Sequence, residues 1–167
     1  MSKSFPTTTV AGVELPRLLI GCNWISGFSH QTPARDELIR RKHHAPESVA
    51  DIFETFLNEG VNAVLGLFGT DEDLLDSVKL AQERTGQEVT ILDTVVINVD
   101  DSPMARHEAE LEIKASAKRG AKFCLPLHSC VEQLLNRNTG TIDRLPDYLK
   151  MIRDAGMIPG LSAHMPE

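Results

Sequence analysis

Apolar residues recur with helical spacing in four segments of the chain. In residues 45–59, Val49, Ile52, Phe53 and Phe56 lie at i, i+3, i+4 and i+7, which places them on one face of a helix. The same kind of spacing predicts three more helices, over residues 70–85, 101–119 and 143–155.

The ends of these helices carry signals of their own. Thr70 and Asp73 have the spacing of a capping box. Ser102 followed by Pro103 is typical of a capping residue and the first helical position. A glycine follows each predicted helix, where a left-handed residue would turn the chain toward the next strand; these are Gly60, Gly86, Gly120 and Gly156.

Short apolar runs alternate with the helices and predict five strands, over residues 17–22, 61–67, 89–99, 121–127 and 158–162. Nearly continuous apolar strands between helices indicate the α/β class with a parallel sheet covered on both faces. An open doubly wound sheet and a (βα)8 TIM barrel both fit this order. We favour the barrel, because the sequence passes from the fifth strand into Pro166 and Glu167, which look like a first helical turn. The expectation is a single domain over residues 1–167 that forms the first half of a barrel, a truncated barrel or part of a longer chain.

Two segments do not follow the alternation. Residues 7–15 predict a small hairpin around Ala11 and Gly12. Residues 26–44 predict a long loop after the first strand, and long loops in compact domains are usually functional or mobile. This loop holds Arg35 and a basic run over residues 40–44. These residues could bind a phosphate or carboxylate, or they could form a solvated charged surface.

The charge and the cysteine content of the sequence bear on its expected partners and cellular compartment. The formal charge of −7 argues against a general nucleic-acid or anionic-membrane surface, so the expected partner is a small molecule, with a homo-oligomer as a further possibility. Three cysteines leave at least one unpaired in any disulfide scheme. With no apolar signal segment at the start and no run of 18 apolar residues, we expect a cytoplasmic protein.

Polar residues at the carboxyl ends of the predicted strands are the candidates for chemistry, because barrel enzymes place their reacting groups there. His128 and His164 end neighbouring strands, and Asp93 lies within the strand before them. Together they could hold zinc, iron or manganese, or act as general acids and bases. Alternatively, each histidine hydrogen-bonds a nearby loop, and Asp93 is paired structurally.

Trp24 is the only tryptophan of the chain and, with Asn23, follows the first strand. An aromatic side chain at that edge either lines a ligand site or packs against the loop. Cys22, Cys124 and Cys130 have no base paired with them in the sequence pattern, so we interpret them as packing residues.

Several motifs resemble those of the aldo/keto reductase-like barrels. Residues 21–24, Gly-Cys-Asn-Trp, resemble the Gly-Thr-x-Trp ending of that family's first strand. Residues 58–62, Asn-Glu-Gly-Val-Asn, are similar to its Ala-Gly-Ile-Asn motif before strand two. Residues 71–75 look like its Ser-Glu-Glu-Leu-Leu helix start, and residues 160–164, Gly-Leu-Ser-Ala-His, like its Gly-Val-Ser-Asn-His segment on strand five.

The resemblance implies a nicotinamide cofactor and a catalytic tetrad of Asp, Tyr, Lys and His. His128 matches the tetrad histidine, but Leu65 and Thr94 stand at the Asp and Lys positions. Ser162 matches the serine that contacts the nicotinamide, and we group it with Asn23 and Trp24 as candidate cofactor-binding residues.

Three hypotheses about function follow. The first is a small-molecule enzyme, lacking the reductase tetrad, that works through His128, His164 and Asp93, with a metal-assisted lyase, isomerase or hydrolase step as one form. The second is an NADP-dependent oxidoreductase of atypical mechanism. The third is a ligand-binding barrel without catalysis.

Overall fold

The structure is a computed structural model that describes residues 5–43 and 45–164. His44, Pro166 and Glu167 lie outside the described residues, and with them part of the basic run and the expected helical turn at the end. The helices are α1 (Pro33–Lys42), α2 (Pro46–Asn58), α3 (Glu72–Thr85), α4 (Pro103–Lys118), α5 (His128–Gln133) and α6 (Leu145–Asp154). The strands are β1 (Thr7–Val10), β2 (Val13–Pro16), β3 (Ile20–Gly21), β4 (Ala63–Gly66), β5 (Thr90–Val95), β6 (Phe123–Pro126), β7 (Leu135–Asn136), β8 (Thr141–Ile142) and β9 (Ile158–Pro159).

Five strands form one parallel sheet in the order β3-β4-β5-β6-β9. Its neighbours follow the order of the chain, with Ile20 paired with Val64, Asp93 with Cys124, and Cys124 also with Pro159. The α/β class that the apolar pattern predicts is therefore confirmed.

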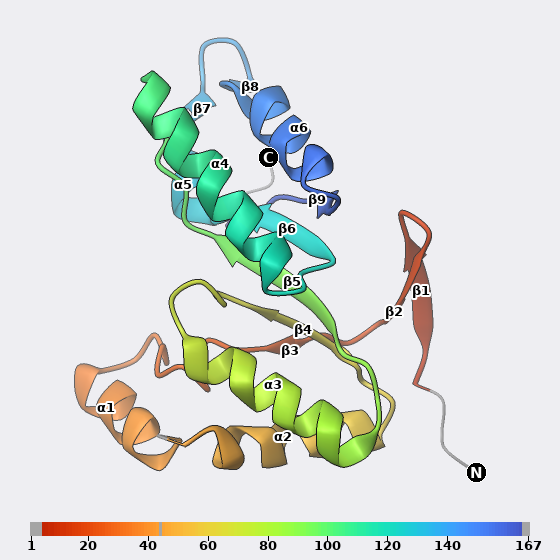
Figure 1. Cartoon of the computed structure of the whole chain (residues 1–167). Coiled ribbons are helices and arrows are strands. Elements are labelled where there is room, and N and C mark those ends of the chain that lie inside the picture. The colour runs from red at the N-terminus through yellow and green to blue at the C-terminus, as the bar shows by residue number, and fades with distance from the viewer. Residues whose placement is uncertain (1–4, 44, 165–167) are drawn as a thin grey trace. The chain divides into compact units, whose positions relative to one another are not determined.

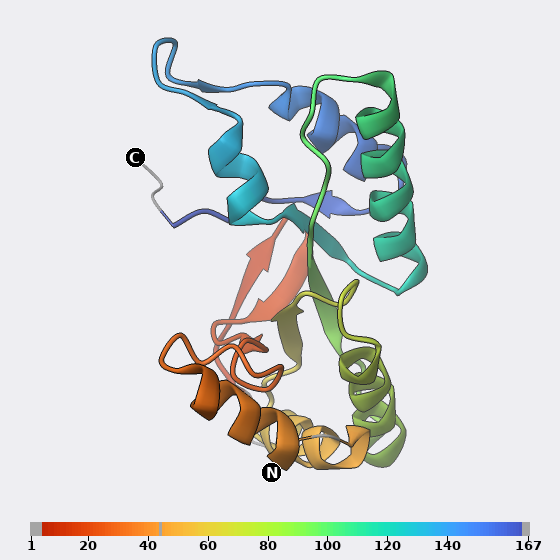
Figure 2. The same cartoon turned by 90° about the vertical axis from the view of Figure 1, so that its left-hand side faces the viewer.

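The chain divides into two compact units, Met1–Ile91 and Leu92–Glu167. In the first unit, α2 and α3 run side by side, as Figures 1 and 2 both show. The apolar stripe of α2 is buried there through Val49, Phe53 and Leu57, and α3 contributes Val78. In the second unit α4 packs beside α6, with Ile113 and Ile152 fully buried.

The predicted hairpin forms, and the four predicted helices are present with ends that differ from the expected bounds by one or two residues. β1 and β2 pair antiparallel around Ala11 and Gly12. Ser102 caps α4 as expected, but α3 begins one residue later than predicted, since the carboxylate of Asp71, not Thr70, accepts the N–H of Leu74. All four glycines that follow the predicted helices have the positive φ that this turn requires, between +68° and +90°.

Three parts of the structure were not predicted from the sequence. Residues 26–44 are not a continuous loop, because they contain α1, which starts at Pro33 behind the capping residue Thr32. This helix has few apolar residues and hence no periodic signal. The helix α5 has 6 residues, and β7 and β8 have 2 each, too few for a pattern to repeat.

Candidate functional site

Two histidine rings meet at the carboxyl ends of two neighbouring strands. His128 begins α5 directly after β6, and His164 follows β9. Because β6 and β9 are paired in parallel, both residues lie at the same edge of the sheet. The ring centroids are 3.9 Å apart and the ring planes are inclined by 41°. The structure thus brings together the two histidines that the sequence singled out.

Glu132 holds His164 in this arrangement. Its Oε1 lies 3.5 Å from Nδ1 of His164 and accepts the backbone N–H of the same residue at 3.4 Å. Glu132 stands four residues after His128 on α5, which places both on one face of the helix. Glu132 does not stand out in the sequence, since its i, i+4 spacing from His128 has meaning only once a helix is known to start at His128.

Asp93 lies elsewhere in the same unit, fully buried on the side of β5 that faces α4. Its Oδ2 accepts hydrogen bonds from Oγ of Ser116 at 2.7 Å and from Nε and Nη2 of Arg119 at 3.1 and 2.9 Å. Arg119 also pairs with Glu112 at 2.8 Å. The sequence left open whether Asp93 acts in catalysis or is paired structurally; in the structure its carboxylate is paired with Ser116 and Arg119 of the α4 segment.

The predicted metal ligands consequently do not form one cluster. Among the residues that the structure describes, there is no group of three His, Cys, Asp or Glu side chains placed to hold a metal ion. His128 and His164 approach each other, whereas Asp93 is engaged by Ser116 and Arg119.

Arg119 is well suited to its structural role. Partial burial of the guanidinium lowers its pKa, but the hydrogen bond to Glu112 and the charge of Asp93 outweigh this effect, so the pKa of Arg119 is raised overall. The arginine therefore stays charged and compensates the buried carboxylate of Asp93.

The candidate cofactor residues fall in both units. Asn23 and Trp24 follow β3 in the first unit, where the side-chain amide nitrogen of Asn23 lies 3.4 Å from Nε2 of His30. The ring of Trp24 is about half exposed, with the guanidinium carbon of Arg35 lying 5.1 Å from its centroid. Ser162 belongs to the second unit, where its backbone N–H donates to the carbonyl of Pro126 at 3.3 Å.

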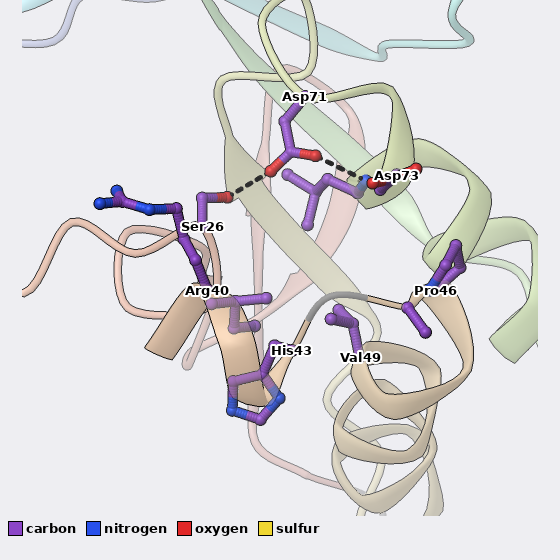
Figure 3. Close-up of a pocket in the computed structure, with 10 residues that line it drawn as sticks. Ser26, Arg40, His43, Pro46, Val49, Asp71 and Asp73 are labelled. Carbon is purple, nitrogen blue, oxygen red and sulfur yellow. Dashed lines mark hydrogen bonds between the residues drawn. The ribbon is translucent and has the colours of Figure 1, made fainter. Parts of the chain in front are cut away.

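A cavity of about 330 Å³ opens in the first unit between the loop after β3, α1 and the starts of α2 and α3 (Figure 3). Figure 3 shows the hydroxyl of Ser26 pointing toward the carboxylate of Asp71, and Oγ donates to Oδ2 at 2.7 Å. Arg40 and His43 of the α1 end line the same cavity. Nδ1 of His43 is buried without a hydrogen-bond partner in the described part of the chain. The lining includes the cation Arg40 and the carboxylates Asp71 and Asp73. The cavity therefore favours neither an anionic nor a cationic ligand.

The three cysteines of the sequence are buried and do not have the features of a catalytic nucleophile. Burial raises the pKa of the Cys22 thiol to about 12, and the charge of Asp71 adds to this rise. Burial likewise raises the pKa of Cys124 to about 12. Cys130 is buried and directs its sulfur toward the carbonyl of Ile97 at 3.4 Å. The interpretation of Cys22 and Cys124 as packing residues agrees with these protonated thiols.

The sequence matches no protein-family model, and a search of curated proteins finds no match. In the described residues, none of the helices has the length and apolar character needed to cross a membrane.

Proposed function

We propose that this chain belongs to a small-molecule enzyme with a (βα)8 barrel similar to the aldo/keto reductases, and that His128 and His164 transfer protons in its reaction. The parallel sheet whose strands follow chain order supports a barrel, because in a doubly wound sheet the first strand has neighbours on both sides. The hairpin β1-β2 before the sheet is also similar to the start of such barrels.

The contact between the two imidazoles carries the proposal. Their ring centroids are 3.9 Å apart where two parallel strands end, and barrel enzymes place their reacting groups at this edge. Imidazole is the side chain that most often exchanges protons near neutral pH. Two of them side by side can act as base and acid on neighbouring atoms of one substrate, as an isomerase, lyase or hydrolase step requires.

Glu132 would serve as a positioning residue. Its carboxylate lies beside Nδ1 of His164, so it can hold the tautomer with the proton on Nδ1, in which Nε2 is free to take a proton from the substrate and to return it afterwards. Asp93 has no part in this step, because its Oδ2 is occupied by Ser116 and Arg119.

The test follows proton transfer without knowledge of the substrate. The protein is incubated in D2O with a panel of small aldehydes, ketones and hydroxy acids, and deuterium incorporation at carbon next to the carbonyl is followed by NMR. We expect one or more compounds to exchange, and His128→Gln or His164→Gln to slow that exchange by roughly 10²-fold or more. The control Lys79→Gln changes an exposed lysine that pairs with Asp76 on α3 and should leave the rate unchanged.

Three outcomes would contradict the proposal. If both histidine variants exchange as fast as the wild type, the chemistry takes place elsewhere. Saturable NADPH binding with hydride transfer to an aldehyde would favour the NADP-dependent oxidoreductase, in which His128 keeps its family role and another residue supplies the proton. Ligand binding without exchange or turnover would favour the non-catalytic barrel.

A further inference from the structure

The helix α1 presents one face to an open groove in the first unit. Residues 35, 38, 39 and 42 follow the spacing i, i+3, i+4, i+7, so they share this face. The groove has a volume of about 730 Å³, and its lining includes Trp24, Arg35, Leu38, Ile39, Lys42 and Ile52. It is built wholly from the segment between β3 and the middle of α2.

The walls of this groove are apolar and unusually exposed. The Trp24 residue is 48% exposed and Leu38 is 65% exposed, although large apolar side chains are more often covered. Ile39 and Ile52 form the floor beneath them. An apolar body placed here would cover surface that now contacts water, which is favourable by the hydrophobic effect.

The charges at the groove are uniformly positive. Neither Arg35 nor Lys42 has a carboxylate partner in residues 5–43 and 45–164. The two acids of α1 are engaged away from the groove: Asp36 accepts the backbone N–H of Ser29 at 2.9 Å, and Glu37 pairs with Arg41 at 2.8 Å. The charge of these two cations is therefore available to a ligand.

The position of Arg35 is partly set in advance. Its guanidinium carbon lies 5.1 Å from the centroid of the Trp24 ring, within the range of a cation–π contact. This contact keeps the charge next to the aromatic wall, so less side-chain freedom remains to be lost when an anion binds.

We propose that this groove binds a small amphipathic anion, a molecule with an apolar body of several carbons and a carboxylate or phosphate group. The apolar body would lie between Trp24, Leu38 and Ile52, and the anionic group would pair with Arg35 or Lys42. Charge complementarity selects this occupant, because an uncharged apolar molecule would leave both cations unpaired. The proposal is independent of the reaction assigned to His128 and His164.

The sole tryptophan of the sequence provides the readout, since all tryptophan emission of the protein comes from the groove wall. Titration with octanoate, which does not absorb in this range, should give a saturable change in Trp24 emission, with the same affinity by calorimetry. Acetate has the charge without the apolar body, and octylammonium has the body with the opposite charge. Neither should bind at the concentrations that saturate octanoate.

Single substitutions test each half of the site. Arg35→Gln and Lys42→Gln should each weaken octanoate binding by roughly fivefold, the usual effect of removing one exposed charge partner. Leu38→Gln should weaken it by a similar factor or more, because it removes part of the apolar wall. The matched control is Arg41→Gln, which lies on the same helix but does not line the groove and pairs with Glu37; it should bind octanoate normally.

Three results would overturn the proposal. The first is equal binding of octylammonium, which would show an apolar surface without charge selection. The second is unchanged octanoate affinity in both the Arg35 and Lys42 variants. The third is a dimer that Leu38→Gln dissociates while octanoate does not bind, which would make the groove a contact between copies of the chain.

Discussion

Arg119 donates two hydrogen bonds to a single oxygen of Asp93, Nε at 3.1 Å and Nη2 at 2.9 Å, and so neutralises a carboxylate that has no exposed surface. The pair joins the middle of β5 to the residue that ends α4. Asp93 is a candidate for catalysis in the sequence. In the structure it instead links the sheet to the helix that covers it, through its ion pair with Arg119.

Removal of Arg119 should destabilise the fold strongly. Arg119→Ala leaves the buried carboxylate of Asp93 with the Ser116 hydroxyl, and we expect a loss of about 3 kcal/mol in the free energy of unfolding. Glu112→Gln removes only the partly exposed partner of Arg119 and should cost less than about 1 kcal/mol. Urea denaturation followed by circular dichroism measures both, and equal stabilities of wild type and Arg119→Ala would contradict the structural role.

The start of α3 offers a direct comparison of two neighbouring residues. Asp71→Ala should cost about 1–2 kcal/mol, because it removes the acceptor both for the N–H of Leu74 and for the hydroxyl of Ser26. Asp71→Asn keeps a capping oxygen and should lower the free energy of unfolding by only a few tenths of a kcal/mol. Thr70→Ala is the matched control, since Thr70 is exposed and its hydroxyl donates to the carbonyl of Leu67 rather than accepting from α3. A larger loss from Thr70→Ala than from Asp71→Ala would restore the capping box predicted from the sequence.

Gly160 follows β9 where no side chain fits. A Cβ placed on this residue would lie 2.9 Å from Cγ of Leu125 on β6. Gly160→Ala should therefore destabilise the protein by about 1–3 kcal/mol through overpacking. In the background of Leu125→Ala the same substitution should cost clearly less, because the clashing atoms are gone. A double-mutant cycle by urea denaturation measures the difference, and additive losses would show that the close approach is relieved in another way.

The buried thiols make stability depend on alkaline pH. Burial raises the pKa of Cys124 to about 12, whereas an unfolded thiol ionises near pH 8.5. The unfolded state therefore releases its proton first. The stabilisation is fully present below about pH 8.5 and is lost as the pH rises toward 12, with a slope of up to ~1.4 kcal/mol per pH unit for each thiol.

Urea denaturation between pH 7 and 10.5 should accordingly show a shallower alkaline decline for Cys124→Ala than for the wild type. Cys22→Ala should behave in the same way, since burial and the charge of Asp71 raise the pKa of Cys22 as well. In the native protein at pH 8 a thiol reagent should react far more slowly than in urea, where all three cysteines of the sequence respond. Identical pH slopes in wild type and both variants would contradict this account.

The sequence by itself determined the order and type of the main elements. The helices α2, α3, α4 and α6 bury apolar stripes with a period near 3.6, and a residue with positive φ follows each of them at a glycine. These are local properties, because they depend on residues a few positions apart. The proximity of His128 and His164 followed from the same order, since strands that are neighbours in the chain became neighbours in the sheet.

Only the tertiary structure decided which face of the sheet each strand residue occupies. Both faces of β5 are buried, so its apolar pattern does not distinguish the side of Asp93 from the side of Thr94. The positions of Ser116 and Arg119 settle that Asp93 faces the helices. The link from Glu132 to His164 and the groove beside α1 likewise join residues through packing of separate elements. Such contacts depend on the direction of side chains in space, which spacing along the chain does not specify.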